Sequence, residues 1–204
     1  ALQVVSASQY AFTAASSDNR REHQGWGFPN LRTMWDRRAR TFIVDEQVAI
    51  TQGQTQAYSI TVPAGEPSLK VCLNYADPAA NPASSVALIN NLSLRVTAPD
   101  NTVYWGNNGL TSGVWSLAGG SEDSINPIEN VFVPNPQAGT WLVEVIATAV
   151  VQDARVETPD VDADYSLVVV GGNGQLPNFS SFLAFGAGCA GSLRVPSPAC
   201  AALN

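Results

Sequence analysis

The sequence predicts an all-β protein, an antiparallel β-sandwich or jelly roll of about eight strands, with a short helical segment at the N-terminus. Three observations predict it. Apolar and polar residues alternate in several short runs, and turn-forming residues separate these runs. Such alternation is typical of antiparallel strands that bury one face and expose the other. With 204 residues, of which 45% are hydrophobic, the chain is long enough for one sizeable domain with its own core.

The alternating runs predict the central strands one by one. The first run places Tyr58, Ile60 and Val62 on one face of a strand. The same period of two recurs in four further runs: Leu69, Val71, Leu73 and Tyr75; Leu92, Leu94 and Val96; Trp141, Val143 and Val145; and Tyr165, Leu167 and Val169. Proline, glycine, aspartate and asparagine mark turns between the runs, at residues 63–65, 77–78, 99–101 and 137–139. We therefore expect the sandwich domain to span residues 41–171.

The residues on either side of the expected sandwich differ from it in character. Residues 1–15 are rich in alanine and compatible with a helix, and Pro29 is placed to start a second short helix that runs to residue 40. We expect residues 1–40 to form a helical and loop segment in which Trp26 and Trp35 anchor the chain to the sandwich. Residues 172–204 are predicted to be a linker and the start of a further module or tail.

The three cysteines carry two predictions. Cys189 and Cys200 enclose a short loop rich in small residues and proline, which predicts a disulfide and an oxidising, extracellular location. Cys72 is left over and is expected to be a small packed residue rather than a reactive thiol.

The charge of the chain argues against two classes of partner. The formal net charge is -7, and Lys70 is the only lysine beside nine arginines. Because nucleic acids and anionic membranes are bound by basic surfaces, we expect neither as a partner. No run of eighteen apolar residues occurs in the sequence, so we also expect no membrane insertion.

The order of several short motifs resembles one known family, the C-terminal β-sandwich (jelly-roll) domain that follows the catalytic domain in secreted subtilisin-like serine proteases. Residues 24–27, Gln-Gly-Trp-Gly, resemble a motif that follows the catalytic domain, and residues 72–78 resemble a family segment that leads into Asp-Pro. The block Pro-Gln-Ala-Gly-Thr-Trp at residues 136–141 is the best match. The resemblance extends over about residues 24–171, and residues 1–15 resemble the closing helix of the catalytic domain.

This resemblance implies a function for the chain but not an enzyme within it. The family's Gly-Thr-Ser, His-Gly and Asp-Ser/Thr-Gly motifs are absent, and the only histidine, His23, lies in a polar stretch beside Glu22 and Gln24. The implied role is a non-catalytic accessory domain of a secreted serine endopeptidase. It would stabilise the catalytic domain of the same parent chain, its partner, and help to position protein substrate. The alternative is an independent carbohydrate- or protein-binding module of a secreted or surface protein.

Calcium is the one candidate cofactor, and the resemblance implies where it would bind. Sandwiches of the family carry calcium near an Asn-Asp-Leu-Asp-Leu segment, and residues 90–94 here read Asn-Asn-Leu-Ser-Leu, which removes two formal charges. The candidate oxygen ligands are Asp77, Asn91, Asp123 and Glu129. The alternative is that Asp77 caps its Asp-Pro turn and that Glu129 accepts hydrogen bonds from loop amides.

Residues 160–164, Asp-Val-Asp-Ala-Asp, form a second candidate for calcium because their spacing is similar to the start of a calcium-binding loop. The loop lacks the glycine at its sixth position and the glutamate at its twelfth, where Tyr165 and Gly171 stand. We therefore favour a solvated hairpin tip at this place.

An aromatic surface is the third candidate site. Tyr104, Trp105 and Trp115 flank small polar residues that include Asn107. Aromatic rings beside amides suit a sugar or a peptide, so Tyr104, Trp105 and Asn107 form a candidate binding surface. The alternative is that the rings pack a long loop onto the sheet, which we favour for Trp115.

Overall fold

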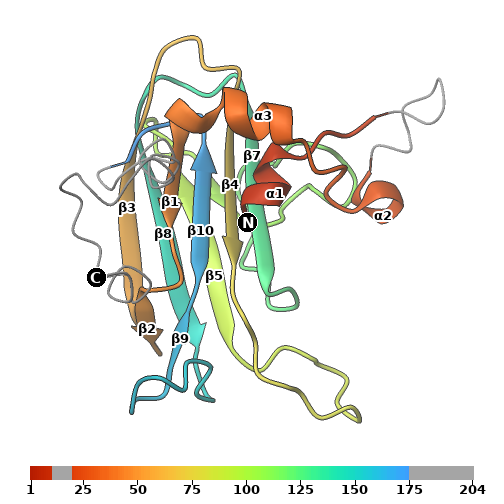
Figure 1. Ribbon diagram of the computed structural model, residues 1–204, viewed down its shortest axis with the longest axis vertical. Coiled ribbons are helices and arrows are strands. Elements are labelled where there is room, and N and C mark those ends of the chain that lie inside the picture. The colour runs from red at the N-terminus through yellow and green to blue at the C-terminus, as the bar shows by residue number, and fades with distance from the viewer. Residues whose placement is uncertain (11–19, 175–204) are drawn as a thin grey trace, which may run out of the picture.

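The computed structural model describes residues 1–10 and 20–174 of the chain (Figure 1). In these residues three short helices and a 3-10 turn precede ten strands. The helical elements are α1 (Leu2–Ser6), α2 (Arg21–Gln24), α3 (Leu31–Asp36) and η2 (Arg38–Arg40). The strands are β1 (Thr41–Val44), β2 (Ala49–Thr51), β3 (Thr55–Val62), β4 (Ser68–Asn74), β5 (Asn91–Thr97), β6 (Val103–Trp105), β7 (Ile128–Pro134), β8 (Gly139–Ala149), β9 (Asp162–Asp164) and β10 (Ser166–Val170).

The strands form two four-stranded antiparallel sheets that face each other. One sheet has the order β1-β10-β4-β7 and the other has the order β3-β8-β5-β6, while β2 pairs with β9 at one end. Strands that follow one another in sequence often lie in opposite sheets, which is the connectivity of a jelly roll. The predicted all-β sandwich is therefore confirmed. The described residues contain ten strands rather than about eight, because β2 and β9 have three residues each, too few for alternation to reveal them.

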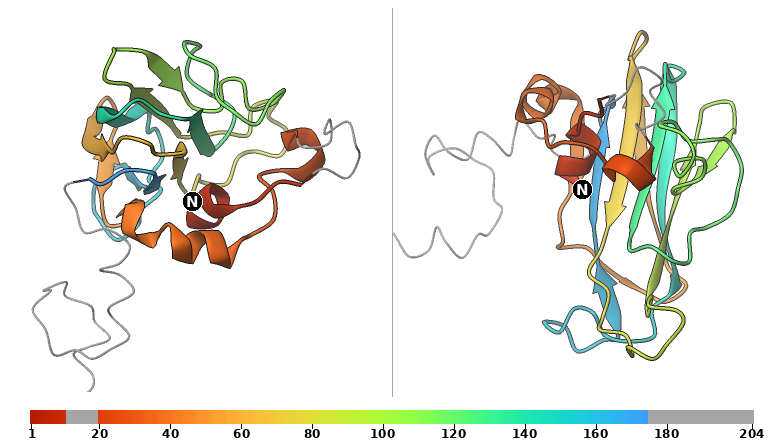
Figure 2. Two further views of the ribbon diagram at one scale, coloured as in Figure 1. Left: turned by 90° about the horizontal axis from the view of Figure 1, so that it is seen from above. Right: turned by 90° about the vertical axis from the view of Figure 1, so that its right-hand side faces the viewer.

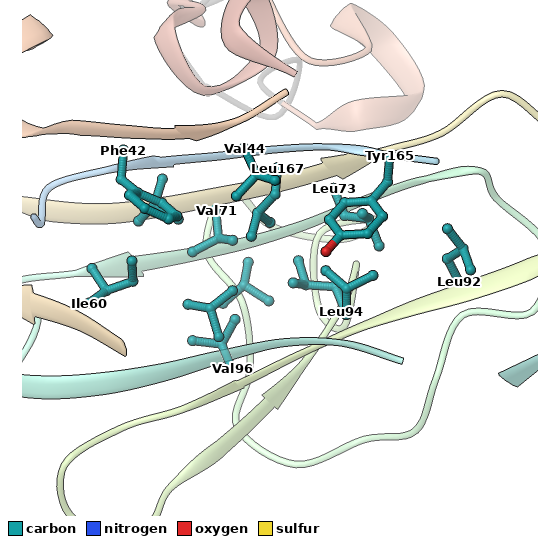
Figure 3. Close-up of a cluster of buried hydrophobic side chains, with 14 of the residues drawn as sticks. Phe42, Val44, Ile60, Val71, Leu73, Leu92, Leu94, Val96, Tyr165 and Leu167 are labelled. Carbon is teal, nitrogen blue, oxygen red and sulfur yellow. The ribbon is translucent and has the colours of Figure 1, made fainter. Parts of the chain in front are cut away.

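The core lies between the two sheets, as Figure 3 shows. All five alternating runs contribute their apolar faces to it, with Val71 and Leu73 from one sheet opposite Leu94 and Val96 from the other. Trp141 and Tyr165 are the largest side chains that are fully buried. Turns are present at residues 64–65 and 99–100, as predicted, and the chain bends at residues 135 and 138 between β7 and β8, whereas residues 77–78 form no turn. Asn101, before β6, adopts a φ of 68°, a left-handed conformation that asparagine tolerates.

The sheet β1-β10-β4-β7 is covered on its outer face as well. Side chains that alternate with the core residues, among them Cys72, Val168 and Val170, form a second apolar cluster there. Val5 of α1 closes this cluster and is only 1% exposed. The two views of Figure 2 show the N-terminal helices against this sheet, on the side away from β5 and β6. The first residues of the chain are thus part of the folded domain.

The N-terminal segment departs from the sequence prediction in two respects and agrees with it in one. The first helix ends at Ser6, well short of residue 15, and residues 11–19 lie outside the described residues. Trp26 packs edge-on against Phe132, as predicted for an anchor, with ring centroids 6.1 Å apart. Trp35 is no anchor, because it is 55% exposed.

The cysteine predictions have separate outcomes. Cys72 is buried and free, which confirms the prediction of a small packed residue, and burial raises the pKa of its thiol to about 12. Cys189 and Cys200 lie outside the described residues, so their disulfide stays a prediction. Among the described residues, no helix has the length and apolar character needed to cross a bilayer.

Candidate functional site

The N-terminal layer, defined here as residues 1–10 and 20–40, is held together by polar contacts. Ser8 and Phe28 form an antiparallel bridge in which each backbone N–H donates to the other residue's carbonyl at 2.9 Å. Asn30 begins α3, since its Oδ1 accepts a hydrogen bond from the Thr33 N–H at 2.9 Å. The amide of the same side chain donates to Ser8 Oγ at 2.6 Å and so joins α3 to the first segment.

Arginines fasten this layer to the sandwich. Arg37 pairs with the carboxylate of Glu66, whose side chain is only 7% exposed, and lies beside the start of β4. Arg21 lies over the Trp26 ring, 4.3 Å from its centroid, and donates to Asn126 Oδ1 at 3.3 Å. The layer therefore contacts the sandwich both near Arg21 and near Arg37.

The N-terminal layer exposes four large apolar side chains, Tyr10, Phe28, Leu31 and Trp35, which are here together called its apolar face; the Arg38 guanidinium lies over the Trp35 ring, 4.1 Å from its centroid. These side chains are 44%, 57%, 75% and 55% exposed. The rings of Tyr10 and Phe28 touch, with centroids 5.2 Å apart. Leu31 and Trp35 are four residues apart on α3 and so lie on the same side of the helix. A cluster of large exposed apolar side chains is typical of a surface that contacts another protein domain.

Asp77, the first predicted calcium ligand, has both carboxylate oxygens occupied. They accept hydrogen bonds from the backbone N–H groups of Asn90, at 2.7 Å, and Ile89, at 2.8 Å. Asp77 therefore ties the loop after β4 to the start of β5. The alternative interpretation of Asp77 as a capping residue describes its contacts best, although it caps the residues before β5 rather than its own turn.

Both carboxylate oxygens of Asp123 also accept hydrogen bonds, and Asn107 is one of the donors. The Asn107 amide donates to Asp123 Oδ2 at 2.6 Å and to the Ile128 carbonyl at 2.9 Å, while Asn107 Oδ1 accepts from the Asn130 N–H at 3.0 Å. Hydrogen bonds from Asn107, Ile125 and Asn126 hold the pKa of Asp123 below its usual value although burial acts in the opposite direction. Both side chains hold the loop between β6 and β7 in place.

Glu129 is the buried member of the predicted calcium set, with no exposed surface. Its Oε2 accepts a hydrogen bond from the Leu94 N–H at 2.9 Å, and its Oε1 has no partner. Gly106 passes so close that a Cβ there would overlap the carboxyl group. Burial raises the pKa of Glu129 to about 9, and Asp123 and Glu122 add to the increase, so the folded protein holds this group protonated at neutral pH.

The four predicted calcium ligands lie in the loops before β5 and β7 and at the starts of these two strands. Among the described residues, no three histidine, cysteine, aspartate or glutamate side chains lie close enough together to hold a metal ion. Asn91 has a buried Oδ1 without a partner, but Asp77 and Asp123 use their oxygens on backbone and amide N–H groups. Calcium binding by these residues therefore stays a prediction.

The second calcium candidate, residues 160–164, leads into β9. Asp162 is 3% exposed and accepts a hydrogen bond from the Thr158 hydroxyl at 2.7 Å. The expectation of a solvated tip was therefore wrong for Asp162, because β9 pairs with β2 and turns this carboxylate inward.

The predicted aromatic surface is largely used for packing. Tyr104 stacks on the buried Trp141 with ring centroids 6.1 Å apart, and Asn107 is only 9% exposed, with its amide engaged as described above. Trp105, on the edge strand β6, lies beside Arg95 and remains partly exposed. Trp115 was expected to be packed, but it is 39% exposed. Of the three aromatic residues, Trp115 and, to a lesser extent, Trp105 thus expose part of their rings.

A pocket that the sequence patterns did not reveal lies between the N-terminal layer and the outer face of the β1-β10-β4-β7 sheet. It has a volume of about 410 Å³, and its lining includes Trp26, Lys70, Trp115 and Phe132. These residues come from four separate segments, so no short sequence motif could predict the pocket. The only available signal was the isolated lysine in the β4 run, at a position that faces away from the core.

Comparisons with known proteins identify no family. No family model matches the chain, and no curated protein matches it. Among solved structures, the chain is similar to the Bacillus licheniformis lipase BlEst2 in its propeptide form, with 14% sequence identity and a TM-score of 0.35 over 64% of this chain. The match spans 21% of the lipase chain. A likeness this weak carries no argument about function, and the structure itself defines the chain as a jelly-roll β-sandwich domain.

Proposed function

We propose that the chain is a non-catalytic accessory domain of a secreted subtilisin-like serine endopeptidase. In this proposal the apolar face of the N-terminal layer packs against the catalytic domain of the same parent chain and stabilises it. The sandwich then lies beside the catalytic domain, where it helps to position protein substrate. Neither nucleic acid nor a membrane is a partner in this proposal.

The observation that carries the proposal is the apolar face itself. Residues 1–15 resemble the closing helix of a catalytic domain, and the described part of this segment is docked on the sandwich through Val5. The described part of this segment thus lies on the sandwich, and the N-terminal layer as a whole, residues 1–10 and 20–40, exposes four large apolar side chains. A domain that precedes it in the same chain is the natural partner for this face.

The energetics of such a contact are favourable. Full burial of a large apolar side chain contributes about 1.5–3 kcal/mol, and these four residues are still between 44% and 75% exposed. Their complete burial would therefore contribute several kcal/mol, by roughly 25 cal/mol per Å². A catalytic domain in the same chain meets this face at a high effective concentration, which lowers the entropic cost of association.

The alternative, an independent carbohydrate- or protein-binding module, has less support from the geometry. Its proposed surface needed the amide of Asn107 beside the rings of Tyr104 and Trp105. That amide is instead bonded to Asp123 and Ile128, and Tyr104 packs on Trp141.

A variant of the apolar face tests the proposal in the intact parent protease. We expect Leu31→Asp to shorten the half-life of protease activity on heating, because a carboxylate at this position cannot be buried against the catalytic domain without a large desolvation cost. The isolated chain should keep its melting temperature, since Leu31 is 75% exposed there and aspartate is favoured in the first turn of a helix.

The matched control is Val156→Asp, at a position that is 81% exposed in the loop between β8 and β9. This variant should leave the half-life of the parent protease unchanged. Equal half-lives for wild type and Leu31→Asp would contradict the proposal. So would a parent sequence without a serine-protease catalytic domain before residue 1.

A further inference from the structure

The pocket behind the N-terminal layer has the dimensions of a small-molecule site. Its volume of about 410 Å³ lies within the range of about 300–1,000 Å³ that such sites occupy. The β-sheet supplies Lys70 and Phe132, the N-terminal layer supplies Val4, Trp26 and Thr33, and the loop between β6 and β7 supplies Trp115. Three aromatic rings and a single cationic group therefore line one cavity.

Lys70 is the polar group that gives this cavity its chemistry. It lies on the outer face of β4, where its register partners are Phe132 on β7 and Val170 on β10. Its ammonium group lies 5.2 Å from the centroid of the Phe132 ring. Among the described residues, no carboxylate lies within ion-pair distance of the Lys70 ammonium group, and this group donates no hydrogen bond to another described residue.

The surroundings of Lys70 favour an anionic ligand. Burial and the nearby positive charge of Arg37 lower the pKa of Lys70. Arg37 already has an anionic partner in Glu66, whereas Lys70 has none. A partly desolvated cation gains most from a charge-assisted hydrogen bond. A carboxylate that enters the cavity could therefore accept such a bond from the Lys70 ammonium group.

We propose that this pocket binds a carboxylate carried on an aromatic or aliphatic body, with Lys70 holding the carboxylate while Trp26, Trp115 and Phe132 enclose the body. Two sources supply this chemistry: a free small carboxylic acid, and the C-terminal residue of a peptide that ends in an apolar side chain. The inference does not depend on the proposed accessory role, because the pocket lies between the layer and the sheet and does not involve Tyr10, Phe28, Leu31 or Trp35.

The presence of a single lysine allows a direct test. In protein labelled with ¹³C and ¹⁵N lysine, the side-chain signals report on Lys70 alone. The probes are 3-phenylpropanoate and its neutral amide, and the peptide acetyl-Gly-Gly-Phe with a free or an amidated C-terminus. We expect saturable shifts of the Lys70 signals with the acids and binding at least about tenfold weaker with the amides, as a charge-assisted hydrogen bond implies.

Variants separate the two parts of the site. Lys70→Met keeps the aliphatic stem and should abolish the preference for acid over amide, as observed through tryptophan fluorescence. Trp115→Ala should weaken the acid and the amide alike. The control is Arg155→Met, which removes one positive charge from the loop between β8 and β9 and should leave the affinities unchanged.

Each result decides one point. Tighter binding of the peptide acid than of the free acid identifies a chain end as the ligand, and the reverse identifies a small molecule. Equal binding of acid and amide to the wild-type chain would overturn the inference, and this comparison needs no variant. Absence of any saturable shift up to the solubility of the probes would overturn it as well.

Discussion

Replacing Trp141 with alanine is expected to lower the free energy of unfolding by about 3–5 kcal/mol, the usual cost of truncating a buried tryptophan. Trp141 lies on β8, is 1% exposed and stacks against Tyr104. Its indole Nε1 donates to the Gln137 carbonyl at 2.9 Å, across the turn that precedes the strand. Truncation would remove the ring from the core, leave a cavity and deprive the turn of its hydrogen bond.

Urea unfolding of the isolated chain measures this effect, and Trp35→Ala is its matched control. Trp35 is the same residue type but is 55% exposed, so its loss should cost less than about 1 kcal/mol in the isolated chain. If the two variants had similar stabilities, Trp141 would not occupy the core position that the jelly roll assigns to it.

Glu129→Gln is expected to stabilise the chain at alkaline pH and to have little effect at pH 5. The folded state holds Glu129 protonated up to a pKa of about 9, whereas the unfolded chain ionises near the ordinary value of 4.5. Above about pH 5 the unfolded state therefore loses a proton that the folded state keeps. The stability of the wild type falls by up to about 1.4 kcal/mol for each pH unit between these two values, and this loss is complete above the folded pKa.

Glutamine has the same shape and does not ionise, and its carbonyl oxygen can accept the Leu94 N–H that Glu129 now accepts. Urea unfolding of both proteins at pH 5, 7 and 8.5 measures the difference between their profiles. Glu144→Gln is the control, and it is expected to lower the free energy of unfolding rather than to raise it. Glu144 forms an ion pair with Arg95 through two hydrogen bonds, of 2.8 and 2.9 Å, which the amide would weaken. Its loss should cost roughly 1 kcal/mol. Parallel pH profiles for wild type and Glu129→Gln would show that Glu129 is ionised in the folded state.

The sequence predicted the sandwich because one physical signal dominates it. Each central strand buries one face, so residues such as Ile60, Val71 and Leu94 had to recur with a period of two. The covering of the outer face was harder to predict. β10 is apolar on both faces, with Val168 and Val170 turned away from the core, and nothing in its own pattern shows that α1 covers them.

The candidate sites were predicted less well, because the type of a residue does not determine which donors its side-chain oxygens accept hydrogen bonds from. Asp77 and Asp123 are suitable calcium ligands by chemistry, yet nearby backbone N–H groups occupy both. Asn107 looked like a surface amide, but its left-handed backbone, with a φ of 62°, turns it into the protein. The pocket at Lys70 joins segments far apart in the sequence, so only the tertiary structure could assemble it.

The central claim is that the N-terminal layer belongs to the sandwich and presents its apolar face to a catalytic domain. Backbone hydrogen exchange, compared between the isolated chain and the intact parent protease, tests it most directly. In the isolated chain we predict protection at Val5 and at Val168–Val170, where α1 covers the sheet. We predict weaker protection along Phe28–Trp35, where hydrogen bonds of Phe28, Thr33 and Met34 stay within the layer and several side chains face solvent. In the parent protease, Phe28–Trp35 should become more strongly protected. Unchanged exchange of Phe28–Trp35 in the parent, or rapid exchange at Val5 in the isolated chain, would contradict the account.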